Sequence, residues 1–145
     1  TRVYLLSSIY KKNIMNTKLD KILAEISAGE LVDKITILEI KKIKINDNEK
    51  LKEVSKELES LNNTMNDHIK DKSKIADLKD SLKEINSKLW DIENEKRSAE
   101  KNNDFGDKFI QLARNVYKYN DERAKLKLKI NQILNSNIKE VKSHF

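Results

Sequence analysis

The spacing of the apolar residues constrains the fold of this chain more than any other feature. In two long stretches they recur at alternating intervals of three and four residues. That period of 3.5 keeps one stripe of a helix facing a neighbouring helix. The first stripe consists of Leu51, Val54, Leu58, Leu61 and Met65, and the second of Ile75, Leu78, Leu82, Ile85, Leu89 and Ile92, after which Lys96 and Ala99 keep the spacing. The spacing predicts two long helices that pack along narrow apolar seams.

Helix-breaking residues are almost absent. The 145 residues include no Pro and only two Gly, and 37% of them are charged while 6% are aromatic. Such a chain can run in helices nearly from end to end. The apolar pattern is lost at residues 46–49, 66–73 and 102–106, and these interruptions predict four helices.

The first of these helices has a clear start signal. Ser27 is followed three residues later by Glu30, which is the spacing of a capping box. Residues 31–45 then carry apolar side chains on more than one helix face. We expect this helix to be the most buried one, in contact with two neighbours or with a second subunit.

The fourth helix is expected over residues 107–134. Its seam is Phe109, Leu112, Val116, Tyr119, Arg123, Leu126, Ile130 and Ile133. Short connections make neighbouring helices antiparallel, so the third and fourth helices should form a long pair with the first two, end to end, beside it. The predicted fold class is all-α, a bundle or hairpin of long antiparallel helices with coiled-coil-like packing.

The domain organisation follows from the same pattern. We expect residues 27–135 to form a single helical domain, residues 136–145 a polar C-terminal tail, and residues 1–26 an N-terminal extension. The chain does not begin with Met, and Met15 stands just before the patterned region. This favours the interpretation that residues 1–14 are extraneous. The alternative is a native N-terminal segment that packs on the bundle.

Composition bears on the classes of partner. No apolar run approaches the roughly 20 residues that a membrane-spanning helix needs, and no signal peptide is recognisable. The chain has no Cys, which fits a reducing compartment, and we expect a cytoplasmic protein. The net charge of +6 suggests an acidic partner, but Lys50 and Lys52 beside Glu53 illustrate how the charges alternate. This mixture disfavours nucleic-acid binding.

Arginine is rare in this Lys-rich chain, so each Arg is a candidate for a contact that Lys could not make. Arg123 falls on a seam position of the fourth helix, and Arg114 adjoins a second face with small side chains. Arg suits bidentate contact with a carboxylate or another anion. The candidate polar cluster between the helices is Glu30, Asp33, Arg114, Asn120, Asp121 and Arg123. Its structural interpretation is an inter-helix ion pair, and its functional interpretation is a pocket for an anionic ligand.

No motif of catalysis is recognisable. The sequence lacks a phosphate-binding Gly loop, a nucleophile elbow and a His-based metal motif, and His68 and His144 are isolated from other ligand types. We therefore predict no catalytic residue, no metal and no cofactor. Trp90, beside the third seam, is interpreted as a packing anchor.

Three segments carry a resemblance to a known family. They are residues 27–41 (SAGELVDKITILEIK), residues 89–93 (LWDIE) and residues 109–117 (FIQLARNVY), the last continued by NDERA at 120–124. The chain resembles a bacterial and phage-associated family of uncharacterised small proteins over roughly residues 26–143. The resemblance implies a cytoplasmic helical module and supplies no catalytic residues.

Two functions compete at this point. The favoured hypothesis is a non-enzymatic, self-associating helical interaction module, a homodimer with a possible protein partner. The alternative is a small all-α enzyme or anionic-ligand-binding protein with an Arg-containing pocket between helices.

Overall fold

The computed structural model describes residues 17–143, and within them it contains four long helices and no strand. The helices are α2 (Ala28–Lys44), α3 (Asn48–His68), α4 (Ala76–Lys101) and α5 (Asp107–Ile133), with a short 3-10 helix η1 (Lys72–Ile75) before α4. The expected all-α bundle is confirmed. The interpretation of residues 1–14 lies outside the described residues.

Polar side chains set the helix ends where the sequence indicates them. Ser27 caps α2 by accepting from the Glu30 amide, and Asp47 caps α3 by accepting from the Lys50 amide. Beyond α4 and α5, Asn103 and Asn135 adopt positive φ values of 52° and 50°. Asn tolerates this left-handed conformation, which ends a helix. Side-chain caps thus start α2 and α3, and left-handed Asn residues follow the ends of α4 and α5.

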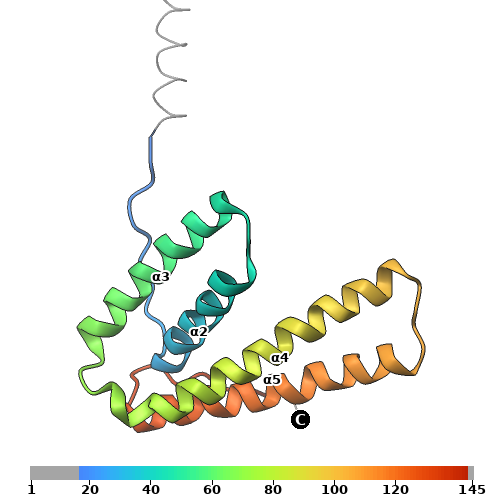
Figure 1. The fold of residues 1–145 in the computed structure, drawn as a ribbon. Helices are drawn as coiled ribbons and strands as arrows, with labels where there is room; N and C mark the ends of the chain where they lie inside the picture. Colours follow the sequence, from blue (N-terminus) through green and yellow to red (C-terminus); the bar gives the residue numbers. More distant parts are fainter. Residues whose placement is uncertain (1–16, 144–145) are drawn as a thin grey trace, which may run out of the picture.

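The helices form two hairpins rather than a row (Figure 1). The α2 and α3 helices fold back on each other, and α4 and α5 run side by side from the same end of the molecule to the far loop. The expectation that the first two helices lie end to end is wrong. The connection 45–47 turns the chain back, because α2 has a second apolar face that only a folded-back α3 can cover.

The core is centred on α2. This helix contacts each of the other three, whereas α3 approaches only α2 among the described helices. The buried side chains of the apolar core cluster are Leu31, Val32, Ile35, Leu38, Val54, Leu58, Met65, Ile69, Ile75, Leu82 and Ile130. The prediction that the first helix is the most buried is therefore confirmed. Most of its apolar side chains are covered within the chain, whereas Ile43 near its end is 72% exposed.

The α4–α5 pair is longer than the part that α2 and α3 cover (Figure 1). Residues 92–119, called here the projecting hairpin, continue beyond the α2–α3 layer as two helices and their loop. Their seam still buries Ile92 and Leu112. Coiled-coil-like packing along this seam stays a prediction. At the other end of the molecule, residues 136–143 return along α5.

Candidate functional site

A buried carboxylate lies where α2, α4 and α5 meet. Asp33 on α2 is 0% exposed. Arg123 on α5 donates from Nε to Asp33 Oδ1 at 2.9 Å and from Nη2 to Asp33 Oδ2 at 2.5 Å. From α4, Asn86 Nδ2 donates to Asp33 Oδ1 at 2.9 Å and to Thr36 Oγ1 at 3.0 Å. These bonds join three helices through one side chain.

Charge and hydrogen bonding keep this carboxylate ionised. Burial raises the pKa of Asp33. The hydrogen bonds from Arg123 and Asn86 and the charges of Arg123 and Lys127 lower this pKa by a larger amount. The net pKa is below the ordinary value of 3.8. The same hydrogen bond raises the pKa of Arg123. The fork of Arg123 is thus occupied by Asp33, and the pair acts as a structural link between helices.

A second polar layer surrounds the first turn of α2. Lys127 on α5 forms ion pairs with Glu30 and, at 3.6 Å, with Glu140 of the tail. The Ser27 hydroxyl donates to Glu140 Oε1 at 2.5 Å and accepts from the Glu30 amide at 3.0 Å. One half of the predicted capping box is therefore confirmed. The Glu30 carboxylate, in contrast, binds Lys127 and Lys34.

The free amides at the start of α2 are taken up by α5 and the tail. The Gly29 amide donates to Asn131 Oδ1 at 2.6 Å, and the Ala28 amide donates to Ser136 Oγ at 3.0 Å. A Cβ atom on Gly29 would clash with the backbone oxygen of Lys127 and lie 2.9 Å from Asn131 Oδ1. Glycine at 29 therefore allows α2 to approach α5, and these amides are occupied within the chain.

A groove opens beside the Asp33–Arg123 pair, at the root of the projecting hairpin. Its volume is about 480 Å³. We call it the root groove, and its lining is Ile37, Asn86, Leu89, Trp90, Glu93, Asn94, Arg97, Val116, Asn120 and Arg123. Apolar side chains from three helices thus meet here with two arginines, two asparagines beyond Asn86 and one carboxylate. This composition suits a protein contact better than a reaction.

The structure brings together part of the cluster expected from the sequence. Glu30, Asp33 and Arg123 lie in the polar layers at the junction, and Asn120 lines the root groove beside Arg123. Asp121 instead pairs with Lys142 of the tail at 2.6 Å. Arg114 is exposed on α5, and within residues 17–143 no hydrogen bond or ion pair joins it to the cluster.

Sequence reasoning missed Asn86, Thr36, Lys127 and Asn131. A usable signal existed for Lys127, because Glu30 and Asp33 are three residues apart while Arg123 and Lys127 are four apart. The two acidic residues therefore share one face of their helix, and the two basic residues share one face of theirs. The two faces can meet across an interface. The role of Asn86 follows only from its place opposite Asp33, which no spacing along the chain reveals.

The described part of the chain has neither a metal-binding cluster nor a membrane-spanning helix. Between residues 17 and 143, no group of three or more His, Cys, Asp or Glu side chains could hold a metal ion. His68 is exposed and lies 2.9 Å from the Thr64 carbonyl oxygen, and His144 lies outside the described residues. In the same part of the chain, no helix combines the length and apolarity that crossing a bilayer requires.

Comparisons with known proteins give one match. The model of DUF6165, a family of unknown function, matches residues 22–145. No curated protein and no solved structure shows significant similarity to the chain. The matched range includes α2 to α5 and the tail, so every residue of the polar junction lies within it.

Proposed function

We propose, from the premise that this chain belongs to the DUF6165 family of unknown function, that it is a non-enzymatic interaction module which self-associates through its projecting hairpin. We further propose that the DUF6165 family is the same as the bacterial and phage-associated family that the sequence resembles. The three resembling segments lie within the matched range. A cytoplasmic site of action fits a chain without Cys.

The observation that carries the proposal is the unequal length of the two hairpins. The projecting hairpin has only two helices, and a pair of helices leaves its outer apolar side chains in water. Ile110 and Tyr117 are 52% and 55% exposed, and Trp90 and Val116 line the root groove. Two such hairpins from two copies would complete a four-helix bundle and cover these side chains.

The charges of the groove favour a second copy as the occupant. Glu93 and Arg97 stand one turn apart on α4, and both line the root groove. A twofold interface places residue i of one copy against residue j of the other, and the reverse. Glu93 of each copy would then face Arg97 of its partner, which makes the surface electrostatically self-complementary.

The alternative, a pocket for an anionic ligand, has less support. It requires a free guanidinium between helices, yet Arg123 donates two hydrogen bonds to Asp33, and Arg114 lies exposed. Arg97 and Asn120 are the remaining polar candidates in the root groove. A ligand there would compete with the second copy for the same surface.

Light scattering coupled to gel filtration tests the proposal. We expect the wild-type chain to be a dimer at micromolar concentration and Trp90→Glu to be a monomer with an unchanged circular-dichroism spectrum. Ile133→Glu, at an apolar position that is 48% exposed near the other end of α5, is the matched control and should stay dimeric.

A monomeric wild type at high micromolar concentration would overturn the proposal, as would a dimeric Trp90→Glu variant. If Trp90→Glu fails to fold, Tyr117→Glu makes the same test, because the Tyr117 side chain is more than half exposed and its replacement leaves the core intact. Trp90 is the only Trp of the chain, so its fluorescence reports burial on dilution without a label.

A further inference from the structure

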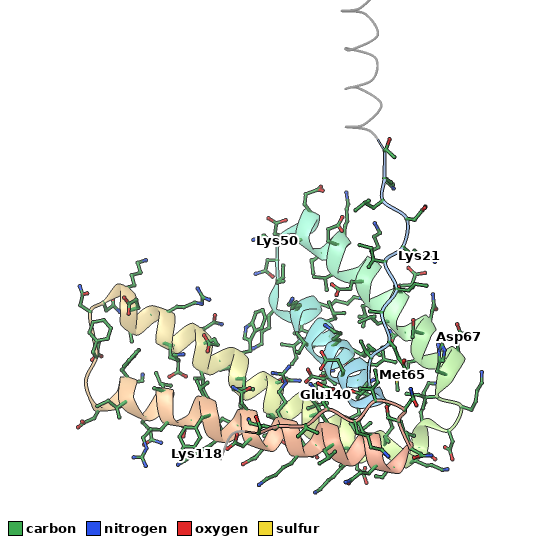
Figure 2. The ribbon with its side chains drawn as sticks, turned by 180° about the vertical axis from the view of Figure 1, so that it is seen from behind. Lys21, Lys50, Met65, Asp67, Lys118 and Glu140 are labelled. Atoms are coloured by element: carbon green, nitrogen blue, oxygen red, sulfur yellow. The ribbon has the colours of Figure 1, made fainter. Side chains whose placement is uncertain are left out.

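Positive charge is concentrated on α5. This helix contains seven basic residues and three acidic ones, whereas α3 contains five acidic residues and three lysines. Five of the α5 basic side chains are exposed, namely Lys108, Arg114, Lys118, Lys125 and Lys129. Figure 2 shows Lys118 on the side of α5 that faces away from α2 and α3. The alternating charges expected along every helix therefore give way here to a basic surface.

Between α5 and the returning tail lies a second groove of about 740 Å³. We call it the tail groove. Ala124 and Leu128 from α5 and Val141 from the tail form its apolar part, and Leu128 and Val141 are 39% and 89% exposed. Its polar lining is Asp121, Lys125, Lys127, Asn131, Lys139, Glu140, Lys142 and Ser143. The tail thus leaves the apolar part of the groove exposed to solvent.

The lysines of the tail groove fall into two groups. Lys142 pairs with Asp121 at 2.6 Å, and Lys127 pairs with Glu30 and Glu140, so these two are neutralised. Lys125 and Lys139 form no ion pair with any residue of the 17–143 segment. The groove therefore presents two uncompensated positive charges beside exposed apolar side chains.

One further polar atom in this lining lacks a partner. Asn131 is 1% exposed, and its Oδ1 accepts from Gly29. Its Nδ2 has no hydrogen-bond acceptor among the described residues. A buried unpaired donor costs free energy, and because Nδ2 is itself buried, an incoming carbonyl or carboxylate oxygen would pair with it after a shift of the tail.

We propose that the tail groove binds an acidic amphipathic peptide segment of a partner protein. Its apolar side chains would cover Leu128 and Val141, and its carboxylates would pair with Lys125 and Lys139. This is the helix-in-groove mode of recognition with a charged rim, and it uses a surface separate from the root groove.

The lining favours a peptide over other acidic partners. A nucleic acid offers no aliphatic side chain for Leu128 and Val141, and the described residues that line the groove include no aromatic side chain for stacking a base. A membrane surface is too broad to enter a groove between a helix and a tail. A peptide helix, about 10 Å across, has the apolar stripe and the carboxylates that the lining calls for.

The test uses fluorescence anisotropy with labelled probes and the full chain. The main probe is a short helical peptide with Leu at the heptad a and d positions and Glu at most others. The matched probe has Lys in place of every Glu. A single-stranded oligonucleotide and vesicles containing phosphatidylserine are the competing partners. We expect saturable, salt-sensitive binding of the acidic peptide alone.

Two variant pairs locate the binding. Lys125→Glu with Lys139→Glu should weaken peptide binding at least about tenfold, because two attractive charges become repulsive. Lys56→Glu with Lys101→Glu changes the net charge equally at exposed positions outside the groove and should leave binding unchanged. Leu128→Ser should weaken binding, whereas Ile43→Ser, at another exposed apolar position, should not.

Three results would overturn the inference. They are absence of peptide binding at low salt, equal binding by the groove and control variants, and tighter binding of the oligonucleotide or the vesicles than of the acidic peptide. None of them depends on the dimer, because Trp90→Glu leaves the tail groove intact and should bind the peptide as the wild type does.

Discussion

The two ends of α4 contrast within one continuous apolar seam. Near its start, Leu82 is 0% exposed under α2, and Asn86 bonds to the buried Asp33. Farther along α4, Ile92 is 7% exposed, and the projecting hairpin continues from there with α4 and α5 alone (Figure 1). The same 3-4 spacing therefore serves a three-helix junction and a two-helix hairpin. An apolar seam indicates that one face of a helix packs against a neighbour. The tertiary arrangement determines how many neighbouring helices cover that face.

The largest difference between the regions should come from Arg123→Met, which keeps apolar volume but removes the partner of a carboxylate that is 0% exposed. Leaving a buried charge unpaired costs about 3–5 kcal/mol, and we expect a loss of that size in the free energy of unfolding, measured with urea. In the projecting hairpin, Lys108→Met breaks the Lys108–Glu95 pair of 3.9 Å between exposed side chains. It should change stability by less than about 1 kcal/mol. Similar losses for both variants would mean that the polar junction contributes no more than a surface ion pair.

A smaller difference is expected at the two glycines. Gly29→Ala inserts a Cβ against the Lys127 backbone and should cost about 1–3 kcal/mol, because α2 and α5 must separate. At Gly106, where the hairpin turns, the nearest atom to a new Cβ would be Asp104 Oδ1 at 3.6 Å. Gly106→Ala should therefore stay within about 0.5 kcal/mol of the wild type. Thermal unfolding measures both, and a neutral Gly29→Ala would show that the α2–α5 contact is loose.

The smallest effect concerns pH. Burial raises the pKa of Asp33, and the hydrogen bonds and positive charges outweigh it, so the folded-state pKa lies below the unfolded one. A lowered pKa adds stability that is complete above the unfolded pKa and is lost as the pH falls through the folded one. Wild-type stability should thus decline in acid from about pH 4 downward, and Arg123→Met should show a shallower decline. The variant should still lose some stability in acid because of Glu39. Burial raises the pKa of Glu39, but hydrogen bonds from Lys83 and Lys79 lower it to below the ordinary value. Parallel pH curves for the two proteins would refute this assignment.

Local sequence was informative wherever the governing interactions are short in range. The capping Ser27 and Asp47, the interruptions before α3, α4 and α5, and the seams of α3 and α4 could all be read from residues within one or two turns. Arg123 could be identified because a charged residue at a seam position requires a partner. Its pairing with Asp33 was among the alternatives expected.

The errors arose where the outcome depends on residues far apart. An end-to-end pair and a folded-back pair of first helices have the same seams, and only the three-dimensional fit to α4 and α5 selects between them. Arg114 and Arg123 were both placed in the expected polar cluster, yet they lie about two and a half turns apart on α5, and Arg123 alone of the two bonds to α2. The basic surface of α5 was not predicted, because its exposed Lys and Arg residues are spaced several residues apart along the chain and come together only on the surface of the folded helix.

The sequence by itself determined that this chain is helical, where its helices begin and end, and which stripe of each is apolar. These properties depend on caps, breakers and spacing, all of which act within a few residues. The tertiary structure alone decided that α2 lies at the centre, that Asn86 and Lys127 join its carboxylates, and that two grooves remain open. Those features depend on which helix faces share an interface, and the free energy that selects them comes from contacts between residues about 40 to 110 positions apart.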